Sequence, residues 1–353
     1  MDSVTQMLLG ATVAQAGFRR RLGRSAMVVG AAIALVPDLD VVVGWSDTFT
    51  NWKHHRGLTH SVFFGPVVGP ALGWLAWRWY RWRRGGAVAN AIQDPSPDDT
   101  LRSWIYLAIL ALMTHVLIDL PTSYGTQALY PLSDYRFAWN GLGIIDIAYS
   151  LILVAALAVG FAARSRPRLA QDGAAGALVL VTAYTLMGMA INGQVEAKAE
   201  AQLYAQYGQE ARVTAYPTLF QPVYRRVVAE RPDEILVGYH SVLSDKPIDW
   251  KRFPRIEGAS IDAVRATEPG RLFSWFAQNN LYWSSVLSSD GNTIVEASDM
   301  RYGVSGDTDL GFWGIRAVVD PEGRIVGPVE PFNRRPSASP QSLSAYWNAI
   351  LGR

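Results

Sequence analysis

The sequence predicts a membrane-embedded α-helical bundle of about five spans plus a short N-terminal helix, followed by a soluble α+β domain with a mostly antiparallel sheet. Three observations support this prediction. Residues 1–192 are mostly apolar blocks separated by short basic runs, residues 193–353 have the composition of a soluble domain, and tryptophans crowd near the ends of the apolar blocks, as a membrane interface favours. The mean hydropathy of +0.09 averages over these two different parts. We therefore expect a polytopic membrane domain at residues 1–192 and a soluble domain at residues 193–353.

The apolar blocks define the expected helices of the membrane domain. Residues 3–18 are too short to cross a bilayer comfortably, so we expect a helix that is re-entrant or packed inside the bundle. Residues 85–100, GGAVANAIQDPSPDDT, indicate an exposed linker because glycine, proline and aspartate favour loops. The five spanning candidates are residues 25–45, 61–80, 104–120, 143–163 and 174–191.

Basic residues predict how these spans are oriented. Arginines gather at residues 19–24, 78–84 and 164–168, and such runs favour the cytoplasmic side of an inner membrane. Five spans then place the loops at 46–60 and 121–142 on the opposite side, together with the C-terminal domain. We therefore predict a multi-pass protein of the cytoplasmic membrane whose C-terminal domain is extracytoplasmic.

The soluble part begins with a predicted helix at residues 195–207, followed by short alternating runs. The pairs Asp290–Gly291 and Glu322–Gly323 are typical of turns between antiparallel strands. This part carries no Gly-rich phosphate loop, no G-x-S-x-G elbow and no H-E-x-x-H motif, so we expect it to shape access to a site elsewhere or to recruit an extracytoplasmic protein partner.

The amino-acid composition excludes several kinds of functional site. The chain has no cysteine, which excludes a disulfide framework, a thiolate nucleophile and a zinc–thiolate site, so nitrogen and oxygen ligands must hold any metal. A net charge of +2, with the arginines at membrane edges, gives no support for nucleic-acid binding.

Two acidic residues lie within the first predicted span. Asp38 and Asp40 belong to the sequence PDLD, and Pro37 cannot continue the hydrogen bonding of the preceding helix. A distorted helix can turn both carboxylates toward one ion. Alternatively, they cap a helix or pair with arginines.

The stretch HHRGLTHS follows in the next polar loop. Gly57 permits a tight turn, so a loop histidine, His55 or its neighbour His54, can converge with His60 at the start of the next helix. Neutral imidazoles are the commonest protein ligands of metals and suit zinc, manganese or iron. Arg56 can pair with a bound anion such as phosphate.

His115 and Asp119 lie one helical turn apart within the third predicted span. Both can bind a metal, or Asp119 can orient the ring of His115 without binding the metal itself. Ionisable groups at membrane depth are costly unless they pair, face water or bind an ion. Because the three clusters fall near the same predicted face of the membrane, we expect one polar site that binds a divalent metal, zinc first, with manganese or iron as alternatives.

Taken together, MDSVTQMLLGA, PDLD, HRGLTHS, THVLIDLPTSYGTQALYPLSD and IIDIAYS resemble the YdjM-like family of inner-membrane metal-dependent hydrolases, over roughly residues 1–150. The resemblance implies histidine and aspartate ligands and a distant likeness to zinc-dependent phospholipase C and related nucleases. The metal-binding residues that it implies are Asp38, Asp40, His55, His60, His115 and Asp119. One position departs from the family pattern, because Gln6 stands where the family usually has histidine. Either one ligand is lost here, or that position lies behind the ligands.

We therefore expect a metal-dependent hydrolase whose site lies at the outer leaflet. Its predicted substrate is a phosphoester, or another ester, of a membrane lipid or lipid-linked molecule. Asp40 and His60 would supply ligands or the general base, and Arg56 would stabilise developing negative charge.

Two other functions use the same residues. An ion transporter would spread polar residues through the bilayer depth, usually with an inverted repeat, and the sequence shows neither. A non-catalytic scaffold would use the metal only to hold the bundle together. Ligand saturation separates the scaffold from the enzyme, because a catalytic metal keeps an open position and a structural one does not.

Overall fold

The computed structural model describes residues 1–43, 45, 47–84, 97–163, 165–305, 309–334 and 340–353. The chain divides into two compact units. The first contains residues 1–42 and 54–187, and the second contains residues 43–53 and 188–353. Residues 85–96, most of the predicted linker, lie outside the described part. The domain boundary at 192/193 stays a prediction; the compact units divide five residues earlier, and the second unit also takes in a short segment from the loop before His54.

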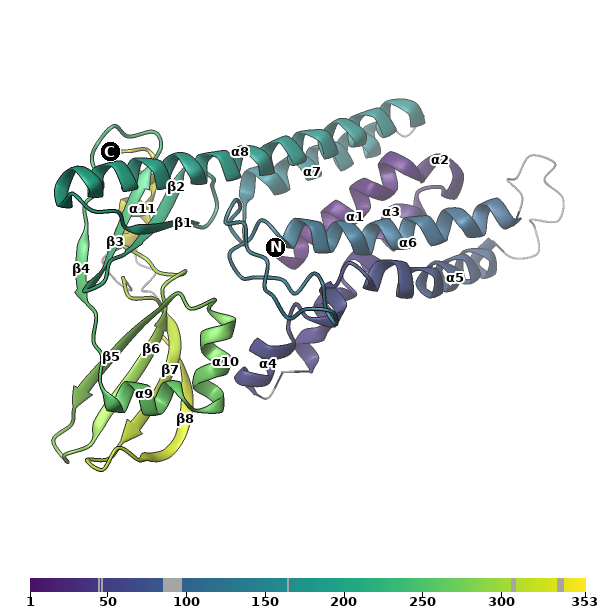
Figure 1. The fold of residues 1–353 in the computed structure, drawn as a ribbon. Coiled ribbons are helices and arrows are strands. Elements are labelled where there is room, and N and C mark those ends of the chain that lie inside the picture. The colour runs from purple at the N-terminus through teal and green to yellow at the C-terminus, as the bar shows by residue number, and fades with distance from the viewer. Residues whose placement is uncertain (44, 46, 85–96, 164, 306–308, 335–339) are drawn as a thin grey trace. The chain divides into compact units, whose positions relative to one another are not determined.

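The first unit is helical (Figure 1). The long helix α8 starts in this unit and continues into the second without a break, so the separate helix predicted at 195–207 is the end of α8. The elements of the first unit are α1 (Ser3–Gly17), α2 (Arg19–Leu22), α3 (Ser25–Ala34), η1 (Pro37–Val42), η2 (Leu58–His60), α5 (Phe64–Arg84), α6 (Pro97–Asp119), α7 (Ile147–Ala162) and α8 (Pro167–Tyr207).

Three segments of the described chain are long and apolar enough to cross a membrane: Ser25–Val42, Asp98–Asp119 and Pro167–Tyr207. They correspond to the first, third and fifth predicted spans. The fourth, α7, is apolar but shorter. In α5 the second half alternates tryptophan with arginine, which leaves no apolar window of membrane thickness. The structure therefore supports three of the five predicted spans by length and composition.

Helix α1 is packed inside the first unit, against α3, α6 and α7. Most residues of α1 from Thr5 to Gln15 are buried, and Leu9 and Val13 belong to the hydrophobic core of the unit. Glycines allow the close approach to α3, because a Cβ atom on Gly10 would lie 2.4 Å from the carbonyl oxygen of Gly30. Small residues at such crossings are typical of membrane helices. Of the two placements left open for residues 3–18, the structure shows the packed one.

We expect Gly10→Ala to destabilise this crossing, because the added methyl group overlaps the backbone of α3. Overpacking of this kind lowers the free energy of unfolding by about 1–3 kcal/mol. Gly17→Ala is the matched control in the same helix, since a Cβ there meets nothing within 4 Å. Thermal unfolding in detergent checks the prediction. Equal melting temperatures for the two variants would show that the α1–α3 approach contributes little to stability.

The described residues of the second unit form two antiparallel four-stranded sheets, with strand orders β1-β2-β3-β4 and β5-β6-β7-β8. The predicted turns at Gly291 and Gly323 both have positive φ and connect β5 to β6 and β7 to β8. The strands are β1 (Arg212–Pro217), β2 (Tyr224–Glu230), β3 (Glu234–Ser241), β4 (Lys251–Pro254), β5 (Leu281–Leu287), β6 (Thr293–Asp299), β7 (Trp313–Val319) and β8 (Ile325–Asn333). The helices are α9 (Ala259–Arg265), α10 (Glu268–Phe276) and α11 (Pro340–Ile350).

The segment from residue 43 to residue 53 packs within the second unit through an aromatic stack. Helix α4 (Thr48–His54) carries Trp52, whose ring centroid lies 4.8 Å from that of Phe273 and 5.3 Å from that of Phe276, both on α10. Aromatic pairs at these separations stabilise the folded state beyond the contribution of the apolar area that they bury. Three residues after Trp52, the chain reaches the predicted site residue His55.

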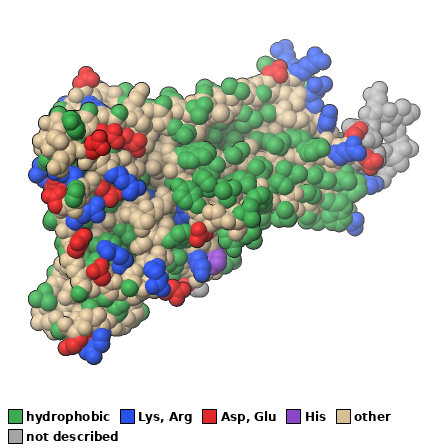
Figure 2. Space-filling view, viewed as in Figure 1, with side chains coloured by type: hydrophobic (Ala, Val, Ile, Leu, Met, Phe, Trp, Pro, Cys, Tyr) green, Lys and Arg blue, Asp and Glu red, His purple; other side chains and the backbone are tan. Residues whose placement is uncertain are grey.

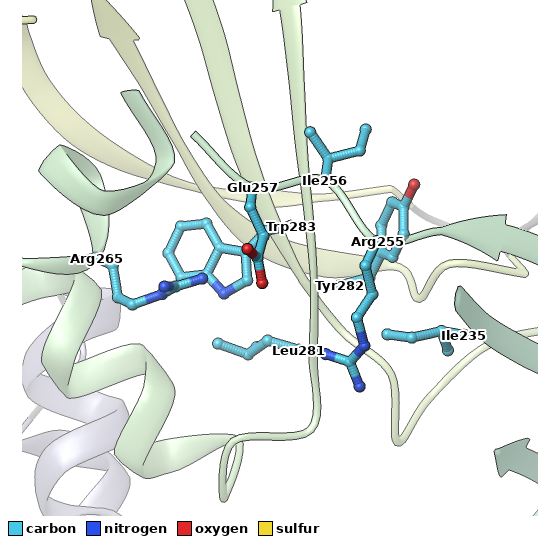
Figure 3. A pocket seen from close by; sticks show the side chains of 8 residues that line it. All are labelled: Ile235, Arg255, Ile256, Glu257, Arg265, Leu281, Tyr282 and Trp283. Carbon is cyan, nitrogen blue, oxygen red and sulfur yellow. The ribbon is translucent and has the colours of Figure 1, made fainter. Parts of the chain in front are cut away.

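A small pocket of about 40 Å³ also lies in the second unit, and its lining includes none of the predicted site residues (Figure 3). Its two guanidinium groups already have partners. Arg255 pairs with Glu230 at 2.9 Å, and Arg265 pairs with Asp262 at 2.9 Å while lying over Trp283. Both arginines of the described lining therefore make ion pairs within the second unit.

Candidate metal centre

Four buried or partly buried side chains of the first unit converge on one point. Asp38 lies on η1, His60 ends η2, and His115 and Asp119 lie on the last turns of α6. Both histidines and Asp119 are fully buried, whereas the side chain of Asp38 keeps 18 % of its surface exposed. One oxygen of Asp38 and one ring nitrogen each of His60 and His115 lie within 4.8 Å of one another, so the cluster can hold a metal ion.

The two imidazole rings are anchored through Nδ1 and point Nε2 inward. Nδ1 of His115 lies 2.6 Å from the carbonyl oxygen of Ala34, which can only accept a hydrogen bond, so this nitrogen carries the proton. Nδ1 of His60 lies 3.2 Å from Oδ2 of Asp40 and 3.1 Å from Oγ1 of Thr59. Such anchoring of the outer nitrogen is the usual arrangement behind a metal-binding histidine.

The Nε2 atoms of His60 and His115 then face each other at 3.0 Å. Two bare nitrogen lone pairs repel at this distance, so a shared proton or a metal ion must lie between them. Oδ1 of Asp38 lies 3.5 Å from Nε2 of His60 and 3.4 Å from Nε2 of His115. Metal–ligand bonds of about 2.0–2.1 Å in a tetrahedron place ligand atoms about 3.3 Å apart, which is close to these separations.

Asp119 supplies a second carboxylate to the cluster. Its Oδ2 lies 3.4 Å from Nε2 of His60 and 3.6 Å from Nε2 of His115, and it is a buried oxygen with no hydrogen bond of good geometry among the described residues. A buried acceptor without a donor is costly, and a cation at the centre would satisfy it. Because the Ala34 carbonyl anchors His115, Asp119 is free to act as a ligand instead of orienting that histidine.

The other oxygen of Asp119 is held by three donors. Arg56 Nη2 lies 3.2 Å from Oδ1, Gln6 Nε2 lies 3.3 Å from it, and the Met1 amino group forms an ion pair with it. The Arg56 guanidinium also donates to Oγ1 of Thr122 at 2.8 Å and stacks over Tyr124. Arg56 therefore positions a candidate ligand, and Gln6 lies behind the ligand atoms rather than among them.

Asp40 and His55 lie beside the cluster. Oδ1 of Asp40 lies 2.7 Å from Nδ1 of His55, while Oδ2 faces Nδ1 of His60 and accepts hydrogen bonds from Oγ1 of Thr59 and the backbone N–H of Arg56. Of the six ligands that the family resemblance implies, the structure therefore brings four to the common point. Asp40 and His55 do not face that point. They form a carboxylate–imidazole pair, and Asp40 contacts the outer nitrogen of His60.

Two features of the centre had no signal in the residue pattern. The Ala34 carbonyl is a backbone atom, and nothing in the sequence marks it as the anchor of His115. Arg56 adopts the left-handed conformation with φ of 62°, which is uncommon for a side chain of this size and typical of strained functional loops. This turn directs its backbone N–H to Asp40 and its side chain to Asp119.

Metal binding is expected to weaken as the pH falls. Burial alone would lower the pKa of His60, but the neighbouring carboxylates of Asp119, Asp38 and Asp40 outweigh this effect and raise the pKa to about 10 in the metal-free protein. The imidazolium must lose this proton before Nε2 can bind a metal, so binding releases a proton at every pH below that value. We expect the apparent dissociation constant to rise by about tenfold per unit of pH lowered from 8 to 6. Titration with zinc at several pH values checks this, and a constant affinity would contradict the release of a proton from His60 on metal binding.

The fold and the centre define a membrane protein with a buried histidine–aspartate cluster that can hold a metal ion. The chain belongs to the YdjM inner membrane protein family, which it matches over residues 1–195, and this confirms the resemblance seen in the sequence motifs. The match covers the whole of the candidate centre.

Two curated relatives agree with this assignment. The uncharacterized protein YfhP of Bacillus subtilis (strain 168) is 27 % identical over 178 residues, which cover 47 % of this chain and 48 % of YfhP. The inner membrane protein YbcI of Escherichia coli (strain K12) is 29 % identical over 129 residues, which cover 35 % of this chain and 65 % of YbcI. The matched regions thus span less than two thirds of either relative. No solved structure matches the chain.

Proposed function

We propose that this protein is a membrane-embedded metal-dependent hydrolase that acts on a phosphoester, or another ester, of a lipid or lipid-linked molecule at the outer leaflet. The observation that carries the proposal is the pair of anchored histidines whose Nε2 atoms face each other at 3.0 Å, with carboxylate oxygens of Asp38 and Asp119 beside them. Two nitrogens and carboxylate oxygens suit zinc first, and also manganese or iron.

The residues present fit such an ion. Asp38, His60, His115 and Asp119 would hold it, and the buried Oδ2 of Asp119 would gain the partner that it lacks. A bound ion of this kind lowers the pKa of a water molecule and polarises the oxygen of a scissile ester. The partly exposed side chain of Asp38 marks the side from which water or substrate can reach the centre.

His55 supplies a proton acceptor next to the cluster. Its ring centroid lies 5.7 Å from that of His60, its side chain is 17 % exposed, and Asp40 holds its Nδ1 at 2.7 Å. Burial lowers the pKa of His55 below its ordinary value, in spite of the opposing effect of Asp40, so the ring is neutral near pH 7 and can accept a proton. We therefore assign the base to the Asp40–His55 pair, and to Arg56 the role of holding Asp119 rather than direct contact with substrate.

A second candidate function, the non-catalytic scaffold, is supported by Asp119. If its Oδ2 binds the ion together with Asp38, His60 and His115, four protein ligands complete a tetrahedral site, and such saturation is typical of structural metals. The ion would then hold η1, η2 and α6 together without any reaction.

Elemental analysis of the detergent-purified full chain, followed by hydrolysis assays, tests the proposal. We expect bound zinc, manganese or iron, and chelator-sensitive hydrolysis of bis(p-nitrophenyl) phosphate or of phospholipids in mixed micelles. Bound metal without hydrolysis of any phosphoester or carboxylic ester would favour the scaffold. Absence of metal after reconstitution would overturn both.

A further inference from the structure

Exposed apolar side chains border the candidate centre on the first unit. They alternate with the site residues along the chain: one lies between Asp38 and Asp40, and another lies between Arg56 and His60. The remainder come from the loop that follows α6. We name this set the apolar collar, and it consists of Leu39, Leu58, Leu129, Leu132 and Tyr135.

Hydrogen bonds tie the loop part of the collar to the ligand-bearing turn. The backbone N–H of Gln127 donates to the carbonyl oxygen of Arg56 at 2.9 Å, and that of Val62 donates to the carbonyl oxygen of Ala128 at 2.9 Å. The Ser61 hydroxyl donates to the carbonyl oxygen of Tyr130 at 2.6 Å. The collar is therefore fixed within a few residues of His60 rather than carried on an independent loop.

The composition of this loop does not fit an aqueous environment. In the predicted orientation, residues 121–142 lie outside the membrane, yet Leu132 is 79 % exposed and Tyr135 and Trp139 are exposed nearby. Large exposed apolar patches mark membrane or partner surfaces, and tyrosine and tryptophan favour the headgroup region. In Figure 2, hydrophobic side chains likewise gather over the helices of this unit, whereas charged side chains are frequent over the sheets.

We propose that the collar lies in the bilayer and binds the hydrocarbon chain of an amphiphilic substrate, which enters the centre sideways from the lipid. This inference rests on the proposed function and adds to it the route of entry and the residues that select the tail. The polar head would reach the cation and Asp38, the partly exposed ligand, while the tail stays among Leu39, Leu58 and Leu132. Water-soluble phosphoesters lack the part that the collar recognises.

The first test measures the depth of the collar and needs no metal or turnover. Because the chain has no cysteine, single variants can carry one nitroxide label each. Leu132→Cys probes the collar, Leu287→Cys on β5 is the water reference at a matched exposure of 73 %, and Val179→Cys on α8 is the lipid reference at 71 %. In phospholipid vesicles we expect the Leu132 label to collide with oxygen and exclude a polar nickel complex, as the Val179 label does. Behaviour like that of the Leu287 label would overturn the proposal.

The second test asks whether the collar binds a lipid tail more strongly than any other lipid-facing surface. Phosphatidate with a diazirine at the end of its acyl chain is photolysed in vesicles with the full-length protein, and the labelled residues are mapped by mass spectrometry. We expect labelling of residues 129–139 to exceed that around Val179 severalfold, and Leu132→Ser to reduce it to that level. Equal labelling of the two regions in the wild type would show ordinary lipid contact and refute tail binding, whether or not the protein hydrolyses phosphoesters.

Discussion

Replacing His60 or His115 by alanine is expected to abolish metal binding while leaving the protein inserted in the membrane. Each variant removes one of the two Nε2 atoms that face each other at 3.0 Å, so a tetrahedral site loses a direct ligand. Removing residues behind the ligands of a metal typically weakens binding about 10–100-fold, and loss of a direct ligand should exceed about 100-fold. Elemental analysis of the purified variants against the wild type measures this loss.

The neighbouring histidine provides a matched control. His54→Ala changes the same motif at an exposed position and should keep the full metal content. His60→Gln and His115→Gln guard against misfolding, because glutamine fills most of the space and lets the folded state be checked by its melting temperature. Metal retained in both alanine variants would refute the assignment, as would metal lost in His54→Ala.

His55→Gln is expected to separate catalysis from metal binding. Glutamine can keep a hydrogen bond to Asp40 but cannot accept a proton near pH 7, so the variant should retain its metal and lose about 10²–10⁴-fold in hydrolytic rate. His54→Gln should change neither quantity. Loss of metal in His55→Gln would instead show that His55 is a ligand, as the family resemblance implies.

The pH profile of hydrolysis gives an independent readout of the same residue. A base must be neutral to accept a proton, and burial lowers the pKa of His55. With metal kept at saturating concentration, the wild-type rate should therefore be level near pH 7 and fall as the pH drops through this lowered pKa. In His55→Gln, this decline attributable to His55 should disappear from the residual activity. If the rate of His55→Gln fell at low pH as the wild-type rate does, the titrating group would be a residue other than His55.

The residue pattern was enough to show which chemistry the centre can have and where along the chain its residues lie. Without cysteine, only nitrogen and oxygen donors remain, and the three clusters at PDLD, HRGLTHS and His115–Asp119 contain all four ligand candidates that the structure brings together. Helical spacing also placed His115 and Asp119 on one face of α6. Turn residues in the second unit predicted antiparallel hairpins because glycine adopts positive φ at little cost.

Residue order alone does not show which of the six predicted ligands face the common point. Asp38 and Asp40 are separated by one residue, and the 3-10 turn of η1, together with the left-handed backbone of Arg56, directs one carboxylate to the centre and the other to His55 and His60. Helix α1 is apolar and short, and only its packing against three other helices shows that it lies inside the unit. The anchor of His115 is the backbone carbonyl of Ala34. Every residue has such a carbonyl, so its role depends on where the folded chain places it, and residue type cannot reveal it.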